Sequence, residues 1–204
     1  MLNEFDGKAR DWDNNPVHNE RSAAISKALL QVLPLHPGMK AMEFGAGTGL
    51  LSFLLKDKLS EITLLDNSAE MIRMAVEKIE KQQIRNMHPL HINLEKEAFS
   101  DTFDIIYTQM VFHHITDIGL IISKLHRLIR PGGFLAIADL YPEDGSFHGE
   151  GFTGHTGFDP EWLSEKLQIA GFSKINYQPC YTIKKNTDPE QYKEFPVFLM
   201  ICSR

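Results

Sequence analysis

The sequence lacks the features that distinguish secreted, membrane and nucleic-acid-binding proteins. Its 204 residues include two cysteines, Cys180 and Cys202, which are too few for a disulfide framework. No apolar run approaches the roughly 18 residues that a membrane-spanning helix needs, and the polar residues 1–10 do not resemble a signal peptide. The net charge is −6 and no run rich in Lys or Arg occurs, so nucleic acid is not an expected partner. These absences predict a soluble, cytoplasmic protein.

The composition is that of an ordinary globular protein. Apolar residues make up 43% of the chain and charged residues 24%, which excludes a disordered or fibrous protein. A chain of this length usually forms one domain and buries roughly 70% of its extended surface, so it needs no disulfide or structural metal to fold. We therefore expect a single domain spanning residues 1–204.

Short apolar runs alternate with amphipathic stretches through the middle of the chain. Ile72, Ala75, Val76 and Ile79 recur at the spacing of one helix face. Each return to a parallel strand needs a crossover element, so this alternation predicts a parallel sheet with helices on both faces. The predicted strands are Met39–Phe44, Ile62–Asp66, Leu90–Asn93, Phe103–Thr108 and Phe134–Ala138.

The two ends of the chain depart from this alternation. Residues 16–33 carry apolar side chains at helical spacing, which predicts a helix before the first strand. Asp159-Pro160 predicts the start of a C-terminal helix, and Gly171 its end. Two further β-like runs, Ile175–Ile183 and Phe195–Cys202, are too close together for a parallel crossover. We expect them to be antiparallel neighbours.

A glycine-rich loop follows the first predicted strand and reads Glu43-Phe44-Gly45-Ala46-Gly47-Thr48-Gly49. Glycine lets the backbone turn sharply and lets a ligand approach it closely. Asp66 ends the next predicted strand, where a carboxylate can accept hydrogen bonds from two ribose hydroxyls. The alternative is that Asp66 only caps the helix that follows. The strand, loop, helix and acid in this order predict a nucleoside site.

The spacing of the glycines distinguishes a dinucleotide such as NAD from a nucleoside ligand without a pyrophosphate. The dinucleotide fingerprint is G-x-G-x-x-G/A, whereas this loop has G-x-G-x-G with Leu50 at the position of the last small residue. Glu43 stands two positions ahead of the first glycine, where a carboxylate would repel a pyrophosphate but suit a cationic amine. An NAD-dependent reductase is therefore disfavoured, although it stays open as a hypothesis.

Four segments together resemble the motifs of class I S-adenosylmethionine-dependent methyltransferases, in the small-molecule, methyltransferase type 11-like subgroup. The glycine loop is similar to the first motif, and Leu64-Leu65-Asp66-Asn67-Ser68 to the second. Residues 103–115 resemble the fourth-strand motif, and residues 128–135 the segment that leads into the fifth strand. The resemblance implies an α/β fold, a Rossmann-like doubly wound sheet of seven strands with an antiparallel last strand and helices on both faces.

The resemblance also implies the cofactor and its site. S-adenosyl-L-methionine would be the methyl donor and S-adenosyl-L-homocysteine the product. Asn93 stands where the family often has an aspartate that bonds the adenine amine; an asparagine both donates and accepts, so the contact can survive. The residues implied to bind the cofactor are Glu43, Gly45, Ala46, Gly47, Asp66, Asn67, Met71, Asn93, Leu94 and Gln109.

The single methyltransferase domain then divides into four parts. Residues 1–36 would form an N-terminal helical cap and residues 38–140 the cofactor-binding core. Residues 141–158 hold five glycines, two histidines and three phenylalanines, which predicts a lid-like loop that closes over the acceptor and excludes water. Residues 159–204 would add the C-terminal helix and the antiparallel strand pair.

The sequence does not name a catalytic residue, because the cofactor supplies the reactivity in methyl transfer and a base is needed only for some acceptors. His113 and His114 follow the fourth predicted strand, and His148 and His155 lie in the lid-like loop. These four histidines are the candidates. The alternatives are a structural hydrogen bond for His113 and ordinary polar loop residues for His148 and His155.

We expect no metal ion. The residues considered as ligands match no compact ligand spacing, and Gln109 replaces the carboxylate that metal-dependent catechol-type enzymes use at its position. The residues considered as metal ligands are Asp139, His148, Glu150 and His155.

The expected function is methyl transfer to a small organic acceptor, and the alternative is a non-catalytic nucleoside-binding protein on the same fold. Five aromatic residues near the expected mouth of the site favour an apolar or aromatic acceptor, although core packing explains them equally well. They are Phe5, Trp12, Phe147, Phe152 and Phe158. The acceptor, the methylated atom and the oligomeric state are not predicted.

Overall fold

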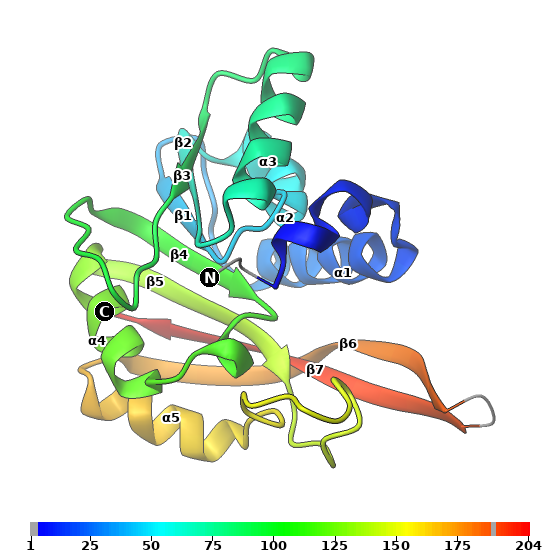
Figure 1. Ribbon diagram of the computed structural model, residues 1–204. Helices are drawn as coiled ribbons and strands as arrows, with labels where there is room; N and C mark the ends of the chain where they lie inside the picture. The colour runs from blue at the N-terminus through cyan, green and yellow to red at the C-terminus, as the bar shows by residue number, and fades with distance from the viewer. Residues whose placement is uncertain (1–3, 189–190) are drawn as a thin grey trace.

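The computed structural model describes residues 4–188 and 191–204, and within them seven strands form one sheet in the order β3-β2-β1-β4-β5-β7-β6 (Figure 1). The strands β1 to β5 pair in parallel, while β7 is antiparallel to both β5 and β6. This arrangement confirms the predicted fold class. The strands are β1 (Lys40–Phe44), β2 (Glu61–Asp66), β3 (Met87–His91), β4 (Phe103–Gln109), β5 (Ile129–Leu140), β6 (Ser173–Asp188) and β7 (Gln191–Ser203).

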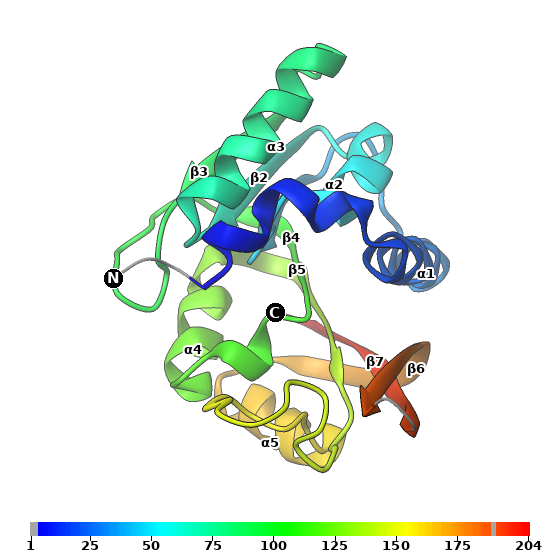
Figure 2. The same cartoon turned by 45° about the vertical axis from the view of Figure 1, so that its right-hand side comes forward.

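Helices cover both faces of the sheet (Figures 1 and 2). The α-helices are α1 (Pro16–Val32), α2 (Leu50–Leu55), α3 (Ala69–Gln82), α4 (Ile118–Leu128) and α5 (Pro160–Ile169), and the short 3₁₀ helices are η1 (Asp6–Asn14), η2 (Lys56–Lys58) and η3 (Phe112–His114). Buried side chains of α1, α2 and α3 join one hydrophobic cluster, and those of α4 and α5 join the other. Within the described ranges, no helix combines the length and the apolar character needed to cross a membrane.

The two clusters follow from the alternation of side chains along each strand, because successive residues point to opposite faces. Ala41 packs with α1, α2 and α3, whereas Met42 packs with α4 and α5. The neighbouring strand repeats the pattern with Ile105 and Ile106. A sheet buried on both faces explains why these strands are continuous apolar runs in the sequence.

Side-chain caps set the beginnings of the helices. Asp159 accepts a hydrogen bond from the backbone N–H of Glu161 at the start of α5, and Gly171, with φ of +98°, follows its end. Asn15 caps α1 in the same way, directly before Pro16. These observations confirm both predicted helices at the ends of the chain.

Two strands differ from the prediction. β3 begins at Met87, three residues before the expected start at Leu90. It contains Pro89, which an edge strand tolerates because one side of its backbone has no partner. β5 begins at Ile129, where α4 ends, so Pro131-Gly132-Gly133 lies inside the strand rather than before it. A register shift opposite Phe103 accommodates these residues.

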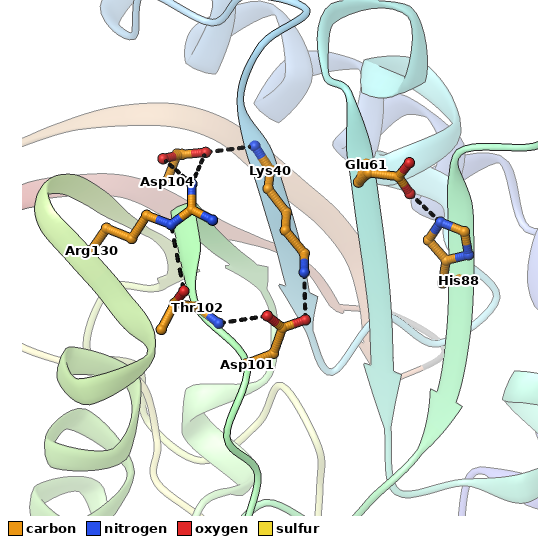
Figure 3. A network of polar contacts seen from close by, with 7 residues as sticks. All are labelled: Lys40, Glu61, His88, Asp101, Thr102, Asp104 and Arg130. Carbon is orange, nitrogen blue, oxygen red and sulfur yellow. Dashed lines mark hydrogen bonds and ion pairs between the residues drawn. The ribbon is translucent and has the colours of Figure 1, made fainter.

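Ionic contacts join the amino ends of β1, β4 and β5 (Figure 3). The carboxylate of Asp104 accepts hydrogen bonds from the backbone N–H of Lys40 at 2.7 Å and from Arg130 Nη1 at 3.0 and 3.1 Å. The Nζ of Lys40 pairs with Asp101 at 2.5 Å. These side chains are partly exposed, so each pair adds about 1 kcal/mol or less to stability. The network occupies one end of the sheet and leaves the carboxyl ends of the strands to the site.

Candidate functional site

A cavity of about 720 Å³ lies at the carboxyl ends of β1, β2 and β4, the edge at which parallel sheets bind ligands. This volume is within the range of roughly 300–1,000 Å³ that is usual for small-molecule sites. Its walls also include the N-terminal segment, α1, the loop 141–158 and β6. The predicted residues that line it are Gly45, Ala46, Asp66, Asn67, Met71, Asn93, Leu94, Gln109, His113, His114 and His148.

Gly45 begins the turn between β1 and α2. Its φ is +68°, and a Cβ at this position would lie 2.3 Å from Cγ2 of Val111. The backbone N–H groups of Gly45 and Ala46 both donate to the carbonyl oxygen of Leu65, at 2.8 and 3.1 Å. Only glycine fits this place, because the conformation and the close neighbour both exclude a side chain.

Gly47 and Glu43 are not among the residues that line the cavity. The N–H of Gly47 donates to Oδ2 of Asp66 at 2.6 Å, so this glycine positions the acid, and its direct contact with the cofactor stays a prediction. Glu43 is completely buried, and its Oε2 accepts hydrogen bonds from Oγ and the backbone N–H of Ser52. Burial raises the pKa of Glu43 to about 8, so its carboxyl group is protonated at neutral pH. A buried, protonated carboxyl group offers no negative charge to a cationic amine, and the role of Glu43 in cofactor binding stays a prediction.

Asp66 ends β2 with its side chain at the cavity and 9% exposed. Its Oδ1 accepts from the N–H of Ser68 at 2.8 Å, and its Oδ2 from Gly47. Burial raises the pKa of Asp66, and these backbone hydrogen bonds oppose that rise. The cap of α3 is Ser68, whose hydroxyl accepts from the N–H of Met71, so Asp66 is not the capping residue. Each oxygen of Asp66 therefore keeps acceptor capacity for a ligand.

Residues from α3 and from the loop after β3 line the cavity beside Asp66. Met71 and Leu94 are 2% and 3% exposed and form an apolar wall. Oδ1 of Asn93 accepts from the backbone N–H of Glu95 at 3.1 Å, which leaves its Nδ2 as a donor. This pairing of apolar walls with a polar edge suits a planar heterocycle.

Gln109 connects the end of β4 to α1. Its side-chain amide is hydrogen-bonded to the hydroxyl of Ser22 at 3.1–3.2 Å, and both residues are buried. Met110 follows with φ of +57°, a conformation that non-glycine residues seldom adopt, and its N–H donates to the carbonyl of Ala138. Local strain of this kind is often found at functional sites.

Three histidine rings meet at the cavity. His113 and His114 come from η3 and His148 from the loop 141–158, and one ring nitrogen of each lies within 4.8 Å of the others. Nδ1 of His113 is 2.7 Å from Oδ1 of Asp139, and both side chains are 1% exposed. Burial raises the pKa of Asp139, but the charge and hydrogen bond of His113 outweigh it and hold that pKa below its usual value. In the neutral form of His113 the ionised carboxylate favours the tautomer with the proton on Nδ1, in which Nε2 carries the lone pair.

The other two rings of the cluster are neutral at physiological pH. Burial, with the charge of His113, lowers the pKa of His114 to about 3 and that of His148 to about 4. His148 stacks on Phe152 with ring centroids 3.8 Å apart, and its Nε2 is buried without a hydrogen-bond partner in the described ranges. Neutral imidazoles are good metal ligands, and this set differs from the residues that the sequence suggested. Ligands held at 2.0–2.1 Å from one zinc ion would stand about 3.4 Å apart, and the nitrogens of these three rings lie within 4.8 Å of one another.

The loop 141–158 lies against η3 and covers the histidine cluster. The backbone N–H of His155 donates to the carbonyl of His113 at 2.8 Å, and its Nε2 lies 3.1 Å from the carbonyl oxygen of Ile115. A Cβ at Gly154 would lie 2.2 Å from the same His113 carbonyl. His155 thus holds the loop and does not line the cavity. Opening and closing of this loop stays a prediction.

The predicted aromatic residues have three different environments. Phe5, Trp12 and Phe147 line the cavity, and Phe152 supports His148. Phe158 is 3% exposed and belongs to the hydrophobic core.

Arg21 on α1 lines the cavity and is 6% exposed, although it is not among the residues predicted from the sequence. A signal was present, because Arg21 precedes Ile25 and Leu29 by four and eight residues and so falls on their buried helix face. Charged residues are seldom fully buried, so an arginine on the buried face of a helix indicates a functional position rather than core packing.

Comparisons with known proteins agree with this geometry. A family model described as a methyltransferase domain matches residues 35–174. An uncharacterized methyltransferase of Schizosaccharomyces pombe is 31% identical over 153 residues, which are 67% of this chain and 54% of the relative. A demethylmenaquinone methyltransferase of Bacillus cereus is 26% identical over 127 residues, 60% of this chain and 54% of the relative. The chain spans about half the length of these curated relatives.

A solved structure shares the fold. The N-methyltransferase NodS of Bradyrhizobium japonicum, in complex with S-adenosylhomocysteine, superposes with a TM-score of 0.69 and covers 94% of this chain and 89% of its own. The sequence identity is 16%, so this similarity shows the fold alone.

Proposed function

Because the chain belongs to the methyltransferase domain family and has the fold of class I S-adenosylmethionine-dependent methyltransferases, we propose that it transfers a methyl group from S-adenosylmethionine to a small organic acceptor. The observation that carries the proposal is one cavity with two chemically different ends. Asp66 and the Gly45 turn lie at one end, and the His113–Asp139 pair lies at the other.

The residues at the first end fit the cofactor. Both oxygens of Asp66 keep acceptor capacity for the ribose hydroxyls, and Gly45 and Ala46 line the cavity where the methionine portion would lie. Met71 and Leu94 would hold the adenine between apolar surfaces, with Asn93 at its edge. When bound, S-adenosylmethionine supplies an electrophilic methyl group whose bonding electron pair stays on sulfur.

His113 can act as the general base at the second end. Asp139 fixes the ring and keeps the proton on Nδ1, so Nε2 can take the proton of an acceptor hydroxyl or amine. The neutral rings of His114 and His148 do not repel the positive charge that His113 gains. Proton removal by a positioned base is worth roughly 10²–10⁴ in rate.

The lining of the second end favours an acceptor with an aromatic or apolar part. Phe5, Trp12 and Phe147 contribute rings to the cavity wall. Demethylmenaquinone methyltransferase, one of the relatives, is named for a small-molecule acceptor. This name supports a small molecule as the acceptor of this chain.

Calorimetric titration with S-adenosylhomocysteine tests the cofactor. Asp66→Ala removes hydrogen bonds to a charged acceptor, so affinity should fall by about 1.5–3 kcal/mol, roughly 10–150-fold. Asp57→Ala removes an exposed acid outside the cavity and should leave affinity unchanged.

Equal affinity of the Asp66→Ala variant and the wild type would refute the assignment of the ribose site. Stabilisation by NAD but not by S-adenosylhomocysteine would favour a reductase. Binding without methyl transfer to any acceptor in a broad screen would favour the non-catalytic alternative.

A further inference from the structure

Arg21 is a buried cation that forms no ion pair with a carboxylate among the described residues. Its side chain is 6% exposed, and its Nε is buried without a hydrogen-bond partner. Within residues 4–188 and 191–204, no carboxylate lies within ion-pair distance of its guanidinium group. Removing a charge from water without a partner costs several kcal/mol. A site that keeps such a residue is built to receive an anion.

The charged neighbours of Arg21 place it at the second end of the cavity. Desolvation by burial lowers the pKa of Arg21 to about 10, and the negative charge of Asp139 at the end of β5 partly offsets this effect. Asp139 is already engaged by His113, so it is not a full partner. Asp66, on β2, lies on the other side of β1 in the sheet.

Two lysines of β6 extend the positive surface but are already engaged. Lys184 pairs with Glu194 at 3.4 Å, and Nζ of Lys185 donates to the carbonyl of Phe147 at 2.5 Å. Both line the same cavity as Arg21. The acids that line it, Glu4, Asp11, Asp66 and Glu95, belong to the N-terminal segment and to the loops after β2 and β3. The side of the cavity formed by α1 and β6 is therefore positive.

We propose that Arg21 binds a carboxylate or phosphate group of the methyl acceptor, which makes the acceptor an acidic small molecule. A planar guanidinium can bind either oxyanion through two parallel hydrogen bonds. This inference rests on the proposed function, since it assigns the acceptor class of the same site. The acidic group would lie on the side of the cavity that holds the His113–Asp139 pair, and so near the atom that is methylated.

The methionine carboxylate of the cofactor is the other possible source of the anion, and binding assays separate the two. S-adenosylhomocysteine carries this carboxylate, and 5′-methylthioadenosine is the same nucleoside thioether without the amino acid. Arg21→Gln should bind both within about threefold of the wild type. A loss of tenfold or more for S-adenosylhomocysteine alone would assign Arg21 to the cofactor and overturn the proposal.

Thermal shifts of the protein saturated with S-adenosylhomocysteine test the acceptor group directly. Millimolar benzoate and inorganic phosphate should stabilise the wild type, while benzamide, which matches benzoate without the charge, should not. Arg21→Gln should abolish the shifts, and Lys27→Gln, which removes an exposed charge from the same helix outside the cavity, should keep them. Shifts that are absent, or that survive in Arg21→Gln, would overturn the proposal.

The stability of the free protein gives a test that needs no ligand. Arg21→Met replaces an uncompensated charge by an apolar side chain of similar length, so the melting temperature should rise by about 2–8 °C. Lys27→Met should change it by less than about 2 °C. A lower melting temperature for Arg21→Met would show a structural role and overturn the proposal. Failure of the wild type to bind S-adenosylhomocysteine would instead overturn the proposed function and leave this stability test in force.

Discussion

Glu43 offers a quantitative test of how the glycine loop is supported, because its carboxyl group is buried and protonated rather than exposed to a ligand. Its folded-state pKa is about 8, against an ordinary value of 4.5. The unfolded chain releases this proton near pH 4.5, whereas the folded protein retains it up to about pH 8. The stabilisation is therefore fully present below pH 4.5 and is lost as the pH rises to 8.

The size of the effect follows from the same two values. Each pKa unit corresponds to 1.36 kcal/mol, so the wild type should lose about 3–4 kcal/mol between pH 5 and pH 8 through Glu43 alone. Glu43→Gln keeps the shape and the acceptor oxygen for Ser52 but cannot ionise. The difference in unfolding free energy between variant and wild type should shift by this amount in favour of the variant.

Urea denaturation at pH 5, 6.5 and 8 measures this difference, because other titrating groups affect both proteins equally. Glu80→Gln, an exposed position on α3, serves as the control and should follow the wild type at each pH. Affinity for S-adenosylhomocysteine should stay within about threefold in Glu43→Gln, since Glu43 does not line the cavity. Parallel stability profiles for wild type and Glu43→Gln would show that Glu43 is ionised when folded and would refute the reasoning.

Two further predictions concern the glycine loop and the histidine cluster. Gly45→Ala should destabilise the protein by at least about 2 kcal/mol and weaken S-adenosylhomocysteine binding tenfold or more, because its Cβ would overlap Val111. Gly47→Ala should cost about 1 kcal/mol of stability through backbone strain. It should keep near-normal affinity in calorimetry, because its Cβ would approach no atom closer than 3.8 Å. Equal losses of affinity in both variants would contradict this assignment. The purified protein should contain no stoichiometric transition metal by mass spectrometry, and EDTA should not change methyl transfer. A bound metal that is lost in His114→Ala would assign the cluster to metal binding and remove His113 from the role of base.

The fold was predictable because its main signals are local. Continuous apolar runs mark strands buried on both faces, and Asp159-Pro160 marks a helix start by a mechanism that needs no tertiary contact. The start of β5 was not predictable in the same way. Proline and two glycines normally interrupt regular structure, and only pairing with β4, through a register shift, keeps Pro131-Gly132-Gly133 in the strand.

The residues of the site also differ in whether local sequence signals predict them. Asp66 and Gly45 were found because their positions are fixed relative to a strand end, which the sequence shows directly. Glu43 belongs to the same motif, yet its place beneath the loop depends on Ser52, nine residues later, and on burial. The His113–Asp139 pair joins residues 26 positions apart. Such partners come together only when the sheet forms.

The distribution of unpaired polar atoms links the site to the stability of the fold. Buried side-chain polar atoms normally have hydrogen-bond partners, and in the described ranges the buried atoms without one are Arg21 Nε, Glu43 Oε1, Thr108 Oγ1 and His148 Nε2. Arg21 and His148 line the cavity, and the other two adjoin the lining residues Phe44 and Gln109 in sequence. The other buried side-chain polar atoms of residues 4–188 and 191–204 satisfy the rule. Two of these four atoms, on Arg21 and His148, thus lie where a ligand could relieve their unfavourable burial, which is the pattern expected when a protein gives up stability for function.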